Sequence, residues 1–204
     1  MNKSLLEKIN SIGLSYREYL NLTLTEIEKS DPMQLREDEN KQLKNKKLNF
    51  HRMNRIGKHH HVSDELISLI NQIDKPQTWM IISETWCGDS AQNIPYISKI
   101  ADLNPNINLK IILRDTNPDI MDLYLTNGTR SIPIFIAFDA TGNELFRWGP
   151  RPQEAKNLFA ELKTQGLEKS GILKKLHLWY GRNRGKNFET ELKEAIQFSL
   201  SISK

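Results

Sequence analysis

A strand pattern, a turn with one cysteine and a helix pattern follow one another directly near the middle of the chain. Residues 78–83 read Thr-Trp-Met-Ile-Ile-Ser, a run of β-branched and aromatic side chains with the length of a strand. Residues 90–103 carry apolar side chains three apart, which predicts one buried face of a helix. These apolar residues are Ile94, Ile97, Ile100 and Leu103. The order predicts an α/β fold in which a strand feeds a tight turn and the turn opens a helix.

The turn contains Cys87, the only cysteine among the 204 residues. The start of a helix has unpaired backbone N–H groups and the positive end of the helix dipole, and both stabilise an anion such as a thiolate. We therefore expect the pKa of Cys87 to lie below that of a free cysteine, about 8.5. Gly88 permits a close backbone approach, and Trp86 can shield the sulfur. We expect Asp89 to point to water and the Ser90 hydroxyl to support the thiolate. The alternative is a small, buried and unreactive cysteine.

The residues around Cys87 resemble the Trp-Cys-Gly-Pro-Cys active site of the thioredoxin family. They read Trp86-Cys87-Gly88-Asp89-Ser90, so Ser90 replaces the second cysteine. Pro95 matches the proline that kinks the active-site helix of thioredoxins. The resemblance covers about residues 63–164 and implies a thioredoxin-like fold, a central mixed β-sheet flanked by helices.

Segments downstream of this helix extend the resemblance. Residues 109–115 match the central strand of thioredoxins, and residues 134–138 and 144–148 match a later strand, turn and strand. Ile132-Pro133 resembles the Ile-Pro pair whose cis bond faces the active cysteine, and Gly149 matches a glycine beside the binding groove. The resemblance implies a substrate-binding groove formed by Trp86, Ile132, Pro133 and Gly149.

Two departures from the family pattern limit the chemistry. Ser90 cannot resolve a mixed disulfide, so the usual intramolecular dithiol cycle is excluded. The buried acid of the family and its lysine partner fall on Ile81 and Ile111, so the proton relay is absent. The resemblance then implies a monothiol thiol–disulfide exchange protein in cell redox homeostasis. Cys87, the catalytic residue, would form mixed disulfides with a low-molecular-weight thiol or a protein partner.

Two other functions remain open at this point. The same groove could bind peptides in a redox-inactive module. Alternatively, Cys-Gly-Asp-Ser resembles the Cys-Gly-Phe-Ser of monothiol glutaredoxins, which share an iron–sulfur cluster between two chains. Trp86 and the spacing to Pro95 favour the thioredoxin resemblance, and no basic residue stands beside Cys87 in the sequence. We therefore expect no cofactor.

Composition and charge narrow the class of protein. The chain is 38% hydrophobic and 26% charged, and it contains no apolar run long enough for a signal peptide or a membrane span. A single cysteine fits a reducing compartment, so we expect a soluble, cytoplasmic protein with no membrane partner. Residues 63–150 carry 6 basic and 11 acidic side chains, whereas residues 1–62 carry 12 and 8, and residues 151–204 carry 11 and 6. The basic residues of the flanks are interleaved with acidic residues, and few aromatic residues accompany them. We therefore expect no nucleic-acid partner.

The flanks read as helical extensions of a central domain. We expect an N-terminal extension over residues 1–62, a thioredoxin-like domain over 63–165 and a C-terminal extension over 166–204. Residues 4–29 have the apolar spacing of one amphipathic helix, and a second helix is expected to start at Ser30-Asp31-Pro32. The C-terminal extension carries two helical faces that we expect to pack on the core, although a homodimer through the extensions is possible. The first face comprises Leu173, Leu176, His177 and Tyr180, and the second comprises Phe188, Leu192, Ala195, Ile196 and Leu200.

The histidines carry no clear catalytic or metal pattern. Three consecutive histidines, His59 to His61, point in different directions on any regular element, and no acid or cysteine stands beside them at a ligand spacing. We therefore expect no metal site. His177 is interpreted as a satisfied core or interface histidine rather than a base, and Trp179 as a packing residue.

Overall fold

The computed structural model describes residues 2–202 and contains one four-stranded sheet. Its strands are β1 (Gln77–Ser83), β2 (Ile107–Leu113), β3 (Ile134–Phe138) and β4 (Glu144–Trp148), in the spatial order β2-β1-β3-β4. β1 pairs parallel with β2 and antiparallel with β3, and β3 pairs antiparallel with β4. The α/β fold with a mixed sheet is therefore as the sequence predicts, with β2 starting two residues earlier than expected.

Successive residues of β1 face opposite sides of the sheet, and both sides are covered by helices. Trp79 and Ile81 belong to a core shared with α4 (Asp64–Ile70) and α5 (Gly88–Ala101). Met80 and Ile82 belong to a second core, to which α1 (Asn2–Ile12) and α6 (Pro118–Met121) contribute. A 3₁₀ turn, η1 (Asp122–Tyr124), follows α6. Ile81 and Ile111 are fully buried, so apolar side chains occupy the two positions where thioredoxins carry the acid and lysine.

The first extension begins with two helices, whereas the sequence reading expected one over residues 4–29. Helix α1 ends at Ile12, and α2 (Tyr16–Glu28) starts after the N-cap Ser15. Ser15 and Glu18 form a capping box, a signal that the apolar spacing masked. Between the helices, the N–H and C=O groups of Leu14 exchange hydrogen bonds with those of Ile111, so the break attaches the chain to the free edge of β2.

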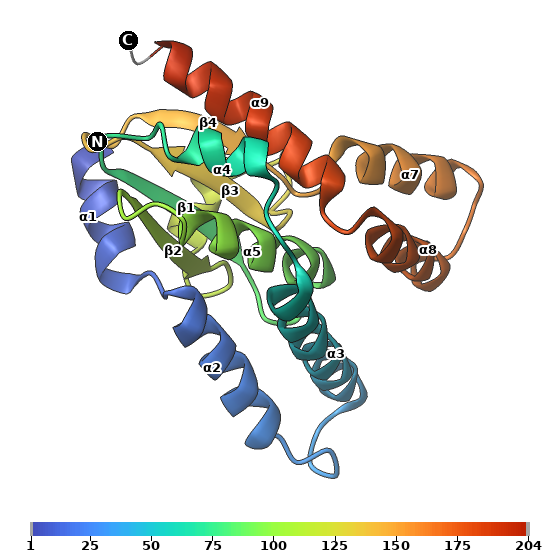
Figure 1. Cartoon of the computed structure of the whole chain (residues 1–204). Coiled ribbons are helices and arrows are strands. Elements are labelled where there is room, and N and C mark those ends of the chain that lie inside the picture. Colours follow the sequence, from blue (N-terminus) through green and yellow to red (C-terminus); the bar gives the residue numbers. More distant parts are fainter. Residues whose placement is uncertain (1, 203–204) are drawn as a thin grey trace.

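Helix α3 (Glu37–His59) starts later than the Ser30-Asp31-Pro32 signal suggested. It packs against α5 and forms a hairpin with α2 that extends beyond the sheet (Figure 1). Leu43 and Met53 are buried, whereas Leu48 is exposed and Asn49 takes an inward position. The hydrogen bond that Asn49 makes at the site, described below, explains why an amide lies there.

The second extension folds back onto the same chain. Helix α8 (Lys169–Asn183) pairs with α7 (Gln153–Thr164), the last helix of the expected central domain, and this pair stands away from the sheet with its own apolar core (Figure 1). Helix α9 (Lys186–Ile202) returns along α4 and β4 and buries Phe188, Leu192 and Ile196. The expected helical faces are thus covered within the chain, and a homodimer stays a prediction. No helix in residues 2–202 combines the length and apolarity needed to cross a membrane.

Candidate functional site at Cys87

Cys87 lies where the sequence placed it, at the junction between the β1 strand and α5. β1 ends at Ser83, and Cys87 is the N-cap residue of α5 with extended backbone angles. The Cys87 thiol donates a hydrogen bond of 3.5 Å to the carbonyl oxygen of Ile132. The Ile132–Pro133 bond is cis. Two segments that are 45 residues apart in the sequence therefore meet at the sulfur.

The environment of Cys87 corrects the expectation of a lowered pKa. Burial of the thiol, with the negative charge of Asp89 second, raises the pKa of Cys87 to about 11. The Ser90 hydroxyl and the backbone N–H groups of Asp89 and Ser90 act in the opposite direction, as expected, but do not prevail. Cys87 is only 7% exposed, so the loss of solvation outweighs the helix N-terminus. The free protein therefore holds a protonated thiol at neutral pH.

Asp89 does not point to water as expected. Its carboxylate forms an ion pair with Arg151 at 2.6 Å and accepts a hydrogen bond from the Tyr180 hydroxyl at 2.9 Å. Asn93 donates to the Asp89 carbonyl at 2.7 Å and to the Tyr180 oxygen at 3.3 Å. Burial and the neighbouring Asp89 charge raise the pKa of Tyr180 well above its usual value. The Asp89 cluster, as we call Asp89, Asn93, Arg151 and Tyr180, thus fixes the first turn of α5 to α8.

The two glycines of the predicted site are needed for close approach. A Cβ on Gly149 would lie 2.3 Å from the Pro133 carbonyl oxygen, and Gly149 has a φ of +127° that favours glycine. A Cβ on Gly88 would lie 2.8 Å from Cε1 of His177. Gly149 therefore packs against the Pro133 backbone, and Gly88 admits a histidine from α8.

A cavity of about 900 Å³ opens at Cys87. Of the predicted site residues, Trp86, Cys87, Gly88, Asp89 and Ile132 line it, whereas Ser90, Pro133 and Gly149 do not. One wall comes from α3 and another from α8, which contribute Arg52 and His177 among others. The sequence reading assigned neither helix to the site, because their contributions are 35 or more positions from Cys87 and follow only from tertiary packing.

Basic side chains line this cavity, although none stands beside Cys87 in the sequence. Six lysines and arginines contribute against two acids, Asp38 and Asp89. The six are Lys41, Arg52, Arg114, Arg130, Arg151 and Lys169. They come from α3, from the loops after β2, before β3 and after β4, and from the start of α8. Basic groups therefore do lie around Cys87 in space, which corrects the expectation from the sequence.

His177 is an interface residue, as the sequence reading expected. Its ring packs against Gly88, and its Nδ1 lies 3.3 Å from Nε2 of Gln92 on α5. Burial, with the positive charges of Arg52 and Arg151 next, lowers the pKa of His177 to about 4. The imidazole is therefore neutral at pH 7 and covers the turn without adding charge. Trp179 packs against the ring of Tyr180, which agrees with its expected packing role.

The loop before Cys87 is held by the first extension. The Tyr19 hydroxyl lies 3.1 Å from Ser83 Oγ, and Asn49 Nδ2 donates to the Thr85 carbonyl at 3.1 Å. The Thr85 hydroxyl donates to Glu26 at 2.7 Å, which in turn pairs with Lys46 at 2.9 Å. Both α2 and α3 therefore fix the backbone that leads to the cysteine.

Of the three consecutive histidines, His60 packs inward, whereas His59 and His61 are exposed. His60 Nε2 lies 2.9 Å from Glu189 of α9, and its ring meets Tyr96 edge-on at 4.5 Å. Within residues 2–202 no group of three or more histidine, cysteine, aspartate or glutamate side chains is arranged to hold a metal ion.

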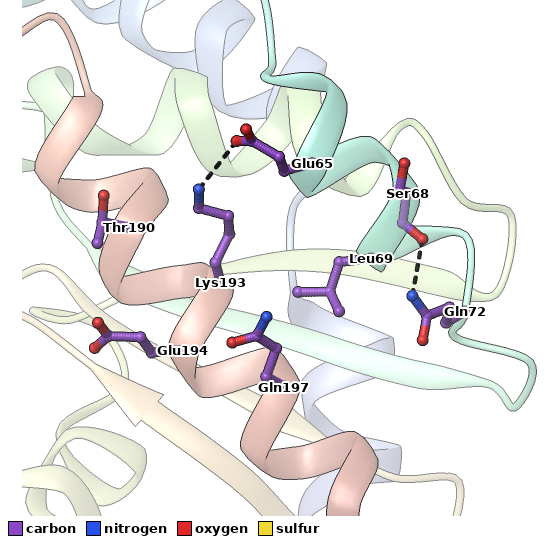
Figure 2. Close-up of a pocket in the computed structure, with 8 residues that line it drawn as sticks. All are labelled: Glu65, Ser68, Leu69, Gln72, Thr190, Lys193, Glu194 and Gln197. Atoms are coloured by element: carbon purple, nitrogen blue, oxygen red, sulfur yellow. Dashed lines mark hydrogen bonds and ion pairs between the residues drawn. The ribbon is translucent and has the colours of Figure 1, made fainter.

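A second hollow lies between α4 and α9 and shares no lining residue with the cavity at Cys87. It measures about 420 Å³, and the Lys193–Glu65 ion pair of 3.2 Å crosses it above Leu69 (Figure 2). Its polar side chains come from both helices and include no cysteine or histidine. We therefore place the candidate site at Cys87.

Comparison with known proteins places the fold. Two solved structures match nearly the whole chain at 18% identity: a protein of unknown function from Pseudomonas aeruginosa and an HIV epitope-scaffold protein. The match to the first structure has a TM-score of 0.57 and covers 94% of this chain and 92% of the other. The match to the second has a TM-score of 0.52 and covers 96% of this chain and 95% of the other. No curated protein matches the sequence. The thioredoxin family model matches residues 36–163, which include Cys87, Ile132 and Gly149 and make up more than half of the chain. The chain therefore belongs to the thioredoxin family.

Proposed function

We propose that the chain is a monothiol thiol–disulfide exchange protein of the cytoplasm in which Cys87 forms mixed disulfides. The observation that carries this proposal is the position of the sulfur. Cys87 Sγ lies at the start of α5, 3.5 Å from the Ile132 carbonyl and on the wall of a cavity of about 900 Å³. A substrate sulfur in that cavity can reach the thiol, and family membership supports the same use of this edge.

The exchange step uses one cysteine, and each proton and electron pair in it has a defined destination. Cys87 first loses its proton to solvent, which also frees the Ile132 carbonyl to accept a bond from a substrate N–H. The thiolate attacks one sulfur of a disulfide, a new S–S bond forms, and the second sulfur leaves with the electron pair and takes up a proton. An external thiol then releases the adduct, because Ser90 cannot resolve it. With a pKa of about 11 the thiolate is scarce at pH 7, so we expect slow exchange in the absence of a bound substrate.

Two assays on the same preparation test this function. We expect the wild type to fail in insulin reduction driven by thioredoxin reductase but to release glutathione from a glutathionylated peptide, with Cys87→Ser as the blank. Ser90→Cys introduces a second thiol three residues after Cys87 and should give measurable but sluggish insulin reduction, because Ile81 stands where thioredoxins carry the buried acid of their proton relay. Robust insulin reduction by the wild type would contradict the proposal. So would a rate of glutathione release from the peptide equal to that of Cys87→Ser.

A second candidate is a redox-inactive peptide-binding module. The burial of Cys87, which raises its pKa to about 11, favours this candidate because a protonated thiol is a poor nucleophile. The two functions differ in the role of the sulfur. A binding module would hold an unmodified peptide with equal affinity in wild type and Cys87→Ser, and neither protein would accumulate a mixed disulfide.

A further inference from the structure

The cavity beside Cys87 holds cations that form no ion pair within the described residues. Arg151 pairs with Asp89, Arg130 with Asp122 at 2.7 Å, and Arg114 with Asp115 at 2.6 Å. Asp38 lies 3.7 Å from Arg36. Among residues 2–202, no salt bridge is formed by the other three basic side chains of the cavity. These three are Lys41, Arg52 and Lys169. The cavity therefore has an excess of positive charge after its own pairs are formed.

Arg52 is the most constrained of these cations. Its guanidinium is half-buried, and its Nη1 donates to Asn49 Oδ1 at 3.1 Å. Burial, followed by the charge of Arg55, lowers the pKa of Arg52, so the charged form lacks full compensation. Asp89 lies near enough to oppose this shift, but its carboxylate oxygens already bind Arg151 and Tyr180. A partly desolvated guanidinium without a carboxylate partner is stabilised when an anion binds to it.

Arg52 also lies next to the nucleophile. Its Nη1 is 3.8 Å from the position that a Cβ would take on Gly88, the residue after Cys87. An acid group bound at Arg52 would therefore be only a few bonds from a sulfur placed at Cys87. Arg is suited to this role because its planar fork matches a carboxylate. Helices α3 and α8 wall the cavity, and its volume of about 900 Å³ is typical of a small-molecule site.

We infer that the cavity selects small anionic disulfides and thiols, with a carboxylate held at Arg52 and the adjoining sulfur presented to Cys87. This inference rests on the exchange function proposed above and specifies its substrate class. Cys87 thiolate would attack the nearer sulfur, the S–S bond of the anionic disulfide would break, and the released thiolate would leave with its own carboxylate and take up a proton. Holding the disulfide in place offsets the scarcity of Cys87 thiolate, because the attack becomes effectively intramolecular.

Three small disulfides of similar size test the charge preference. Dithiodipropionate is anionic, hydroxyethyl disulfide is neutral and cystamine is cationic at neutral pH. The rate of mixed-disulfide formation on the folded wild type would be measured by intact mass and divided by the rate with N-acetylcysteinamide, which removes differences in intrinsic reactivity. We expect the normalised rate to fall from the anionic to the neutral disulfide by about tenfold, the size of one charged hydrogen-bonded contact, and to fall again for the cationic one.

Matched arginine variants locate the preference. Arg52→Gln should abolish most of the anionic advantage, whereas Arg55→Gln, an exposed position one turn further along α3, removes the same charge and should retain it. Lys169→Gln, exposed at the start of α8, should reduce the advantage by a smaller factor. Equal normalised rates for the three disulfides, or an Arg52→Gln preference equal to that of wild type, would overturn the inference and leave the exchange function standing.

A binding measurement separates failure of the inference from failure of the exchange function. If no disulfide modifies the wild type, the exchange function fails, and Cys87→Ser is titrated with dithiodipropionate by calorimetry. Saturable binding that is lost in the Cys87→Ser, Arg52→Gln double variant would support an anion site without exchange. The absence of binding would overturn the anion site as well.

Discussion

Helices α2 and α3 hold the loop before Cys87 chiefly through neutral hydrogen bonds, whereas α8 and the loop after β4 hold the turn after it through a charged cluster. On the first side, Tyr19 and Asn49 bond to Ser83 and Thr85. On the second side, Tyr180 and Arg151 bind the carboxylate of Asp89. The hydrogen bonds on the first side fix the backbone that carries the cysteine. The charged cluster on the second side fixes the negative charge of Asp89 beside it.

The contacts on the second side explain why a helix N-terminus does not activate this cysteine in the free protein. The amides of α5 act on the sulfur as the dipole argument requires. However, α8 lays His177 against Gly88 and helps to keep Asp89 in place, so the sulfur loses water and faces a fixed carboxylate. The raised pKa of Cys87 is therefore a property of the covered site, and it follows from tertiary contacts rather than from the helix alone.

The largest effect is expected from breaking the charged contact. Arg151→Leu removes the ion-pair partner of Asp89, whose side chain is 10% exposed, and leaves that carboxylate nearly buried. We expect a loss of about 3 kcal/mol in the free energy of unfolding, measured by urea denaturation, because an uncompensated buried charge is costly. Arg147→Leu is the matched control, since the Arg147–Glu144 pair is exposed, and it should cost less than about 1 kcal/mol. Equal losses in the two variants would show that the Asp89 cluster is not a stabilising contact.

A smaller effect is expected from breaking the neutral contact. Asn49→Ala removes the hydrogen bond to the Thr85 carbonyl, which lies in the buried loop before Cys87. We expect the free energy of unfolding to fall by about 1 to 2 kcal/mol, because a buried carbonyl loses its donor. Asn54→Ala, at an exposed position of α3, should change it by less than about 0.5 kcal/mol. If both variants unfold at the same urea concentration, α3 does not fix this loop.

The strands and the cysteine could be predicted because their signals are local. The resemblance to thioredoxins predicted β3 and β4 with the observed bounds, and the strand, turn and helix pattern placed Cys87 at the start of α5. The break between α1 and α2 was also readable, since Ser15 and Glu18 form a capping box, but the apolar spacing continues across it. The capping box at Ser15 and Glu18 was a local signal for the break, and the apolar spacing over residues 4–29 outweighed it.

The cavity could not be predicted, because its walls come from segments that only the fold brings together. Arg52 lies 35 positions before Cys87 and His177 lies 90 positions after it, and neither spacing has a meaning in the sequence. Their presence also changes the chemistry of residues that were predicted. Asp89 was read as a residue facing water, yet the packing of α8 makes it a buried ion-pair partner.

The smallest effect concerns the neutral histidine that α8 places on the site. The pKa of His177 is lowered to about 4 in the folded protein, from an ordinary value of 6.5, by burial and then by the charges of Arg52 and Arg151. The unfolded chain therefore binds a proton at this position before the folded chain does. Stability due to neutral His177 is fully present above about pH 6.5 and is lost as the pH falls toward about 4. The slope for one proton is at most about 1.4 kcal/mol per pH unit, and partial exposure of the ring reduces it, so we expect a total of about 1 kcal/mol.

The measurement is urea unfolding at several pH values between these limits for wild type, His177→Gln and His51→Gln. Gln can replace the contact with Gln92 but cannot take up the proton, so the His177→Gln profile should be flatter than that of wild type. His51 lies exposed on α3, and its replacement should leave the wild-type slope unchanged. Other acids titrate in the same range and are shared by all three proteins, so the difference between profiles isolates His177. Parallel profiles for wild type and His177→Gln would mean that α8 does not hold the ring against Gly88 tightly enough to keep it unprotonated. Covering by α8 could then not explain the burial of Cys87.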